Sequence, residues 1–377
     1  MYYKVITILL FCVMTFQVGA QKYKTVLPYR MVGGKMIVDL VMNGTSRSFI
    51  FDTGGRTALT GEICEELGLT VVDSLVVTDV NSKKAAYPLV SIESLITPDQ
   101  KINFKHVSAM KLAKPSPFEC FHTDGLIGSD LLVLTIVEID GKNKTITITS
   151  AENPSTVSLR KMLPFTKSGM PIILLQAGAG NNITALFDTG CPSFFSLKVS
   201  DYETLKTTGA FQVLSEGYGE GSIGVAGMAE ADISHRVCLP VLSVGGTKFQ
   251  NVTSETSTPP FTLLGVKLLD YGKVTLDYPR ARFYFEANEA VNDLSSKHYN
   301  VALRVKDGEL IISTVWSAMK GVVEVGDKVT RINGKPVRMY DFCESIVNGI
   351  PELKGKKKTR LTVQTKQGEK VIVYQKE

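Results

Sequence analysis

The same pattern of five residues occurs twice in this chain, as IFDTG at residues 50–54 and as LFDTG at residues 186–190. In each copy an apolar run leads directly into an aspartate, although folded proteins keep carboxylates out of apolar surroundings unless they are paired or used. The glycine that ends each copy allows a sharp turn where a Cβ would be unfavourable. We therefore predict that Asp52 and Asp188 lie at the ends of two rigid strands and belong to one site.

An internal repeat extends to both sides of this pattern. Residues 35–55 align with residues 171–191 at an offset of 136, and residues 125–140 align with residues 262–277 at an offset of 137. A repeat that keeps its register over this distance indicates two copies of one topology. We expect a pseudo-twofold axis that relates the copies and brings the two aspartates together.

Each copy has the pattern of an all-β structure. Short runs rich in Val, Ile, Thr and Phe are separated by turn pairs such as Asn-Gly, Asp-Gly and Gly-Gly. The clearest helical segment is at residues 61–69, with Gly68 as its stop signal. Residues 76–92 predict a hairpin whose exposed tip lies near residues 81–84, and the glycine-rich residues 217–227 stand in the corresponding place of the second copy.

Two carboxylates held close together have a specific chemistry. They cannot both be ionised at low cost, so they share one proton and titrate as a unit. The ionised member can take a proton from a water molecule while the other donates to a carbonyl oxygen. Asp52 and Asp188 are therefore the candidate catalytic residues for direct amide hydrolysis, and we expect neither a cofactor nor a metal ion.

Each Asp-Thr-Gly is followed later by two aliphatic residues and a glycine, Leu126–Gly128 in the first copy and Leu263–Gly265 in the second. On these paired motifs, over about residues 25 to 290, the chain resembles the pepsin-like and retropepsin-like aspartic proteases. The resemblance implies an all-β, bilobal, pseudo-twofold fold with lobes of the double-psi β-barrel type. It also implies an aspartic endopeptidase that acts on a polypeptide substrate.

The resemblance implies roles for the neighbours of each aspartate as well. The residues that follow the acids would support the two turns: Thr53, Gly54, Thr189 and Gly190. The two threonines would also form hydrogen bonds from one lobe to the other. The hairpin at residues 76–92 would be a flap over the substrate, and Tyr87 on it is either a substrate-binding aromatic or a buried packing residue. The chain departs from the family at Gly55 and Cys191, where Ser, Thr or Ala is frequent, so hydrogen bonding around the acid pair is expected to differ.

The C-terminal part has a different pattern. Residues 287–296 are polar and typical of a linker. Beyond them, VGDKVTRINGKPV at residues 325–337 resembles the core of bacterial-type PDZ domains, with a strand that ends in an Asn-Gly turn and a helix around Met339 to Val347. Such domains bind peptides by adding a strand to a sheet edge, but the expected carboxylate loop near residues 306–311 departs from the family form. Peptide capture and a purely structural module both remain open.

The N-terminus has the layout of a secretory signal peptide. Lys4 precedes an apolar run of fourteen residues from Val5 to Val18, and small residues follow at Gly19 and Ala20. The run is short for a membrane span, so we expect an exported protein, periplasmic or secreted, with no stable membrane span. The predicted organisation is a signal peptide at residues 1–20, lobe 1 at 21–155, lobe 2 at 156–286, a linker at 287–296 and a PDZ-like domain at 297–377.

Cysteine, histidine and charge exclude several other classes of site. The mature chain keeps an odd number of cysteines in no recognised disulfide or zinc spacing, and we expect mostly buried free thiols: Cys64, Cys120, Cys191, Cys238 and Cys343. The histidines are scattered without the spacing of metal ligands. The net charge of +5 comes from the part after residue 296, which has 16 basic and 9 acidic residues. A solvated turn at residues 354–360 explains that excess better than an acidic partner, and no nucleic-acid surface is indicated.

Two interpretations of function remain. The first is an exported, monomeric aspartic endopeptidase whose PDZ-like domain engages polypeptide, because both halves of the site lie in one chain. The alternative is a non-catalytic peptide-binding adaptor built on a degenerate protease body. The intact aspartate in both turns favours the enzyme, and no Gly-x-Ser-x-Gly motif supports a serine hydrolase.

Overall fold

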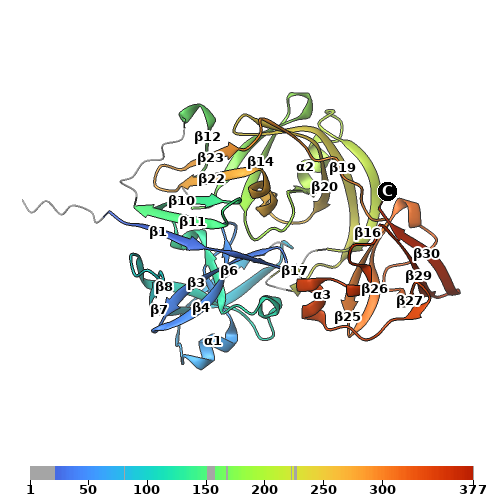
Figure 1. Ribbon diagram of the computed structural model, residues 1–377, viewed down its shortest axis with the longest axis horizontal. Coiled ribbons are helices and arrows are strands. Elements are labelled where there is room, and N and C mark those ends of the chain that lie inside the picture. Colours follow the sequence, from blue (N-terminus) through green and yellow to red (C-terminus); the bar gives the residue numbers. More distant parts are fainter. Residues whose placement is uncertain are drawn as a thin grey trace, which may run out of the picture.

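The computed structural model describes residues 22–79, 81–150, 158–166, 169–221, 223–224 and 227–376. The predicted signal peptide at residues 1–20 lies outside these ranges. Strands dominate the described chain and its α-helices are short, so the expected all-β fold with two lobes is confirmed (Figure 1). Within the same ranges, no helix combines the length and the apolar character that crossing a bilayer requires.

The first lobe is a sheet that closes on itself. Its strand order is β2-β3-β4-β9-β5-β8-β7-β6, and β3 also pairs with β7, so the strands between them form a barrel. The strand bounds are β2 (Arg30–Val32), β3 (Lys35–Met42), β4 (Thr45–Asp52), β5 (Ala58–Leu59), β6 (Val71–Thr78), β7 (Lys84–Ile96), β8 (Asn103–Lys111) and β9 (Gly125–Gly128). The predicted helix is present as α1 (Gly61–Glu66), and the Thr60 side chain caps its first turn.

The second lobe repeats this arrangement. Its strand order is β24-β20-β15-β21-β14-β13-β19-β16, and a further pairing of β19 with β20 closes it. The bounds are β13 (Ile172–Ala177), β14 (Asn182–Asp188), β15 (Phe195–Lys198), β16 (Gln212–Glu220), β19 (Ala231–Val244), β20 (Thr247–Ser257), β21 (Thr262–Gly265) and β24 (Val291–Asp293), with helix α2 (Val199–Leu205) and a small hairpin of β17 (Ile223–Gly224) and β18 (Gly227–Met228). In both lobes the strand that ends in aspartate pairs in parallel with the aliphatic-aliphatic-Gly strand, Asp52 opposite Gly128 and Asp188 opposite Gly265.

A six-stranded sheet joins the lobes across the pseudo-twofold axis. Its order is β1 (Lys24–Pro28), β11 (Thr145–Ser150), β10 (Thr135–Asp140), β22 (Gly272–Asp277), β23 (Arg282–Ala287) and β12 (Met162–Pro164). At its centre Glu138 pairs with Thr275, its own equivalent in the repeat, while Ile136 pairs with Asp277 and Asp140 with Lys273. The register is therefore symmetric about the Glu138–Thr275 pair, which is where the axis passes.

One apolar core runs through both lobes and holds the strands that carry the acids. Phe51 and Phe187, directly before the aspartates, are 1% and 0% exposed. Removing a side chain of this kind from water contributes roughly 1.5–3 kcal/mol to stability. Phe187 also packs edge-on against Phe283 at 5.4 Å between ring centroids. The apolar runs of the repeated pattern thus fix the position of both acids.

The C-terminal unit has a core of its own and continues the sheet of the second lobe. Its elements are β25 (Val301–Lys306), β26 (Glu309–Trp316), β27 (Lys328–Ile332), β28 (Lys335–Pro336), α3 (Phe342–Asn348), β29 (Lys358–Thr365) and β30 (Gly368–Gln375). Strand β26 pairs antiparallel with β16 of the second lobe, and Figure 1 shows the unit beside both lobes. The predicted helix begins later than expected, at Phe342, because the Asp341 carboxylate accepts a hydrogen bond from the Glu344 amide at 2.8 Å and caps it.

Two segments of the C-terminal part differ from their sequence interpretation. Residues 306–311 include the end of β25, a two-residue turn at Asp307 and Gly308 with positive φ, and the start of β26, so the segment expected to hold the carboxylate loop is a tight hairpin instead. The polar stretch at 287–296 includes β24, which pairs in parallel with β20. Short 3₁₀ turns complete the described chain: η1 (Pro117–Phe121), η2 (Ser129–Leu131), η3 (Leu159–Lys161), η4 (Gly178–Gly180), η5 (Val266–Tyr271), η6 (Ser317–Met319) and η7 (Pro351–Leu353).

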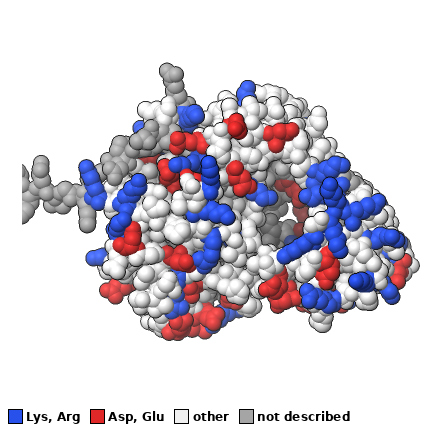
Figure 2. Space-filling view, in the orientation of Figure 1, with Lys and Arg blue, Asp and Glu red and all other residues white. Residues whose placement is uncertain are grey.

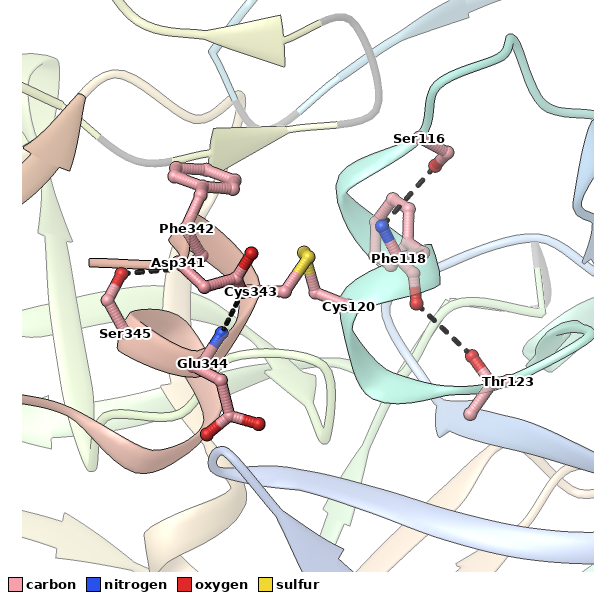
Figure 3. Close-up of a disulfide and its surroundings, with 9 residues drawn as sticks. All are labelled: Ser116, Phe118, Cys120, Thr123, Asp341, Phe342, Cys343, Glu344 and Ser345. Carbon is pink, nitrogen blue, oxygen red and sulfur yellow. Dashed lines mark hydrogen bonds between the residues drawn. A yellow bond between two sulfur atoms is a disulfide. The ribbon is translucent and has the colours of Figure 1, made fainter. Parts of the chain in front are cut away.

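A disulfide links the first lobe to the C-terminal unit. Cys120 on η1 is bonded to Cys343 on α3, across a sequence separation of 223 residues (Figure 3). The expectation of free thiols is therefore wrong for these two cysteines, because the packing of α3 against η1 brings their Cα atoms to 4.7 Å, within the range that a disulfide spans. Cys64 and Cys191 are buried free thiols, and Cys238 is a partly buried one.

Candidate active site

The structure brings Asp52 and Asp188 together at the junction of the two lobes, with their carboxyl groups in hydrogen-bond contact. Each carboxyl group is also held by its own turn. The Gly54 amide donates to Asp52 Oδ1 at 3.0 Å, and the Gly190 amide donates to Asp188 Oδ1 at 2.7 Å. Both acids are thus oriented by backbone donors at the end of a strand.

Gly54 and Gly190 are required by close contact with the opposite acid. A Cβ on Gly54 would lie 2.5 Å from Asp188 Cγ, and a Cβ on Gly190 would lie 2.5 Å from Asp52 Oδ2. Neither glycine has a positive φ, so the sharp turn proposed from the sequence is not what excludes a side chain here. The glycines leave the space in which the carboxyl groups meet.

The two threonines cross-link the turns reciprocally. Thr53 Oγ1 donates to the Phe187 carbonyl at 2.7 Å, and Thr189 Oγ1 donates to the Phe51 carbonyl at 2.7 Å. Each hydroxyl also accepts the other threonine's amide, at 3.0 and 3.1 Å. Both threonines are 0% exposed, so these bonds form away from water and hold the two lobes in register.

The glycines of the second motif also have a packing reason. A Cβ on Gly128 would lie 2.4 Å from the Arg56 carbonyl carbon, and one on Gly265 would lie 2.1 Å from the Ser193 carbonyl oxygen. Strands β9 and β21 therefore approach the segment that follows each aspartate turn too closely for any side chain. This explains why the motif ends in glycine in both copies, 76 residues after Asp52 and 77 residues after Asp188.

Burial and the neighbouring acid control the protonation of Asp188. Burial, followed by the negative charge of Asp52, raises the pKa of Asp188 to about 8, while the positive charge of Lys35 acts in the opposite direction. A carboxyl group in this state keeps a proton near neutral pH, as a proton-sharing pair requires.

Lys35 is a part of the site that the sequence interpretation missed. It begins β3, and its Nζ donates to the Gly190 carbonyl of the opposite turn. The preceding turn is packed tightly, since a Cβ on Gly34 would lie 2.9 Å from Pro192, and one on Gly33 would lie 3.1 Å from the Val347 Cα of α3. The repeat offers no signal for this lysine, because its counterpart in the second copy is Pro171.

The residues that follow the two glycines, Gly55 and Cys191, have no hydroxyl group that could donate a hydrogen bond to Asp52 or Asp188. A Cβ on Gly55 would lie 2.9 Å from Asp52 Oδ2, so little room is left for a side chain there. Cys191 Sγ is 3.0 Å from Ser193 Oγ, and burial raises the pKa of the Cys191 thiol, which keeps it protonated. The site departs from the family pattern at both positions.

The predicted flap is a hairpin of β6 and β7 whose tip contacts the second lobe. Asn81 Nδ2 donates to the Gly227 carbonyl at 3.0 Å, and Lys83 Nζ donates to the Met228 carbonyl at 2.8 Å. The hairpin therefore spans from one lobe to the other. Tyr87 is 6% exposed and packs in an apolar cluster with Leu89 and Phe121. Of the two roles considered for Tyr87, this position agrees with a buried packing residue, and a role in substrate binding stays a prediction.

No set of three or more His, Cys, Asp or Glu side chains is arranged to hold a metal ion in the described ranges. Comparison with solved structures finds similarity to an aspartic proteinase from Irpex lacteus, with 10% sequence identity and a TM-score of 0.42, covering 70% of this chain and 97% of that one. No family model and no curated protein matches the sequence.

Proposed function

We propose that this protein is an aspartic endopeptidase, which hydrolyses peptide bonds with a water molecule held between Asp52 and Asp188. The observation that carries the proposal is the contact of two carboxyl groups from two lobes, each fixed by its own turn and by the reciprocal threonine bonds. Such a pair can act as acid and base at once.

The reaction follows from the proton on Asp188. The Asp52 carboxylate takes a proton from the water, and the water oxygen forms a bond to the carbonyl carbon of the peptide. Asp188 gives its proton to the carbonyl oxygen, which yields a neutral tetrahedral diol. When the carbon–nitrogen bond breaks, Asp52 returns its proton to the leaving amine and a hydroxyl proton goes back to Asp188. The raised pKa of Asp188 supports this assignment of roles.

Export and a monomeric state belong to the same proposal. The signal peptide predicted at residues 1–20 would direct the chain out of the cytoplasm, and the disulfide between Cys120 and Cys343 suits an oxidising compartment such as the periplasm or the extracellular space. One chain supplies both aspartates, so dimerisation is not needed. The C-terminal unit would act as a PDZ-like module, because β25 pairs only with β26 among the described strands and leaves one edge for a peptide.

A non-catalytic peptide-binding adaptor is the second candidate, and Lys35 is the observation that favours it. The positive charge of Lys35 opposes the rise in the pKa of Asp188, which weakens the hold of Asp188 on the shared proton. The two candidates make opposite predictions for the intact chain, because an adaptor binds peptides and releases them uncut.

Digestion of an unfolded protein over a range of pH by the mature full-length chain tests the proposal. We expect cleavage by the wild type and its complete loss in Asp52→Asn and in Asp188→Asn. Asp39→Asn is the matched control, because Asp39 is a partly exposed carboxylate paired with Arg30. Cleavage that survives either active-site substitution would refute the mechanism, and uncut but bound peptide with the wild type would favour the adaptor.

A further inference from the structure

A cavity of about 550 Å³ lies beside the candidate active site, and the C-terminal unit forms one of its walls. The flap tip contributes Asn81, and the segment behind the second aspartate turn contributes Ser193. Strand β25 contributes residues 302–304. The volume is within the ~300–1,000 Å³ that ligand sites usually have. The cavity therefore extends from the flap tip and the segment after the second aspartate turn to the C-terminal unit.

Close packing and hydrogen bonds hold the wall made by the C-terminal unit in place. A Cβ on Gly217 would lie 2.6 Å from the Trp316 ring, and one on Gly219 would lie 2.4 Å from the Ser313 carbonyl. The glycines of β16 thus let β26 approach closely enough to continue the sheet. Arg304 on β25 then closes the side, with Nη1 donating to Glu220 at 2.7 Å and Nη2 to the Gly221 carbonyl at 2.8 Å.

The cavity carries an excess of negative charge. Of its four carboxylates, Glu220 pairs with Arg304 and Glu255 with Arg236. The other two, Glu230 and Asp232, are exposed and have no ion pair within the described residues. His298 adds no compensating charge, because burial and the charge of Arg236 lower its pKa.

The surface around the cavity carries charges of both signs. Figure 2 shows the molecule hollowed between the lobes and the C-terminal unit, with acidic side chains at the hollow and basic ones at its rim and over the outside of that unit. A cationic group beside Glu230 and Asp232 would be attracted locally, although the unit as a whole is basic. An extended peptide that leaves the acid pair towards β25 would place its side chains against Glu230 and Asp232.

We infer that this cavity is a substrate subsite, which takes a Lys- or Arg-bearing stretch of an extended polypeptide on one side of the cleavage point. The inference rests on the proposed function, since it names the substrate class of that same site. The C-terminal unit then contributes to substrate selection as a wall of the cleft. Glu230 and Asp232 are the residues that provide the preference for a cation.

Binding to the full-length Asp188→Asn chain tests the subsite without cleavage. The probes are labelled peptides about ten residues long, which span ~33 Å when extended, with an Ala-rich sequence around a central Phe-Leu. They carry two Lys before the centre, two Lys after it, or Gln at both places. We expect only one Lys placement to bind tighter than Gln, by roughly three- to tenfold, and the gain to vanish between about 50 mM and about 500 mM salt.

Two variants of this chain, compared on the same peptides, complete the test. Glu230→Gln with Asp232→Asn should remove the gain, whereas Asp307→Asn with Glu309→Gln should keep it. The second pair has the same spacing in the C-terminal unit but does not line the cavity. Equal binding of all three peptides, or a gain that survives Glu230→Gln with Asp232→Asn, would overturn the inference. If Glu230→Gln with Asp232→Asn removes the gain from Lys but the wild type cuts no peptide, the proposed activity is refuted and the subsite stands.

Discussion

Thr53→Val is the substitution that most directly tests how the two lobes are held together. Valine has nearly the shape of threonine, so the change removes the hydroxyl with little effect on packing. It leaves the Phe187 carbonyl without its 2.7 Å donor and the Thr189 amide without its 3.1 Å acceptor. Each buried group left unpaired costs about 1–3 kcal/mol, so we expect roughly 2–6 kcal/mol of lost stability in the joined lobes.

Urea denaturation of the full-length chain, followed by intrinsic fluorescence, measures this loss. Thr53→Ser keeps the hydroxyl and removes one methyl group, so it should cost only about 1 kcal/mol. Thr275→Val is the matched control, because Thr275 is 3% exposed and its hydroxyl has no hydrogen-bond partner in the described part of the chain. Its replacement should be neutral or stabilising by about 1 kcal/mol. Equal midpoints for Thr53→Val and Thr53→Ser would refute the reasoning.

Two further predictions concern Lys35 and the disulfide. Lys35→Met removes a positive charge that opposes the raised pKa of Asp188. Because the shared proton is then kept to higher pH, the alkaline midpoint of the pH profile of cleavage should move to higher pH by about one unit. Lys35→Arg should leave the midpoint in place, and an unmoved midpoint in Lys35→Met would contradict the assignment. Cys120→Ser with Cys343→Ser opens a loop closed over 223 residues and should lower the free energy of unfolding by about 2–5 kcal/mol. A reductant should lower the melting temperature of the wild type but not that of the double variant. Equal melting temperatures of the two proteins without reductant would show that the disulfide does not stabilise the fold.

The all-β class and the meeting of Asp52 and Asp188 were predictable, because both depend on local patterns that occur twice. A carboxylate at the end of an apolar strand followed by glycine can be recognised within five residues. Its repetition at an offset that changes by only one residue, from 136 to 137, implies one topology used twice, and hence an axis between the copies. The symmetric register around Glu138 and Thr275 is the physical form of that offset.

What the sequence by itself determined is therefore the repeated lobe and its pair of acids, since each lobe is encoded by short-range alternation and turns. Only the tertiary structure decided the position of Lys35, the bond between Cys120 and Cys343, and the docking of β26 on β16. These contacts occur once and join residues far apart in the chain, so neither periodicity nor repetition marks them. They depend on how separate surfaces of the fold fit together, which no local pattern specifies.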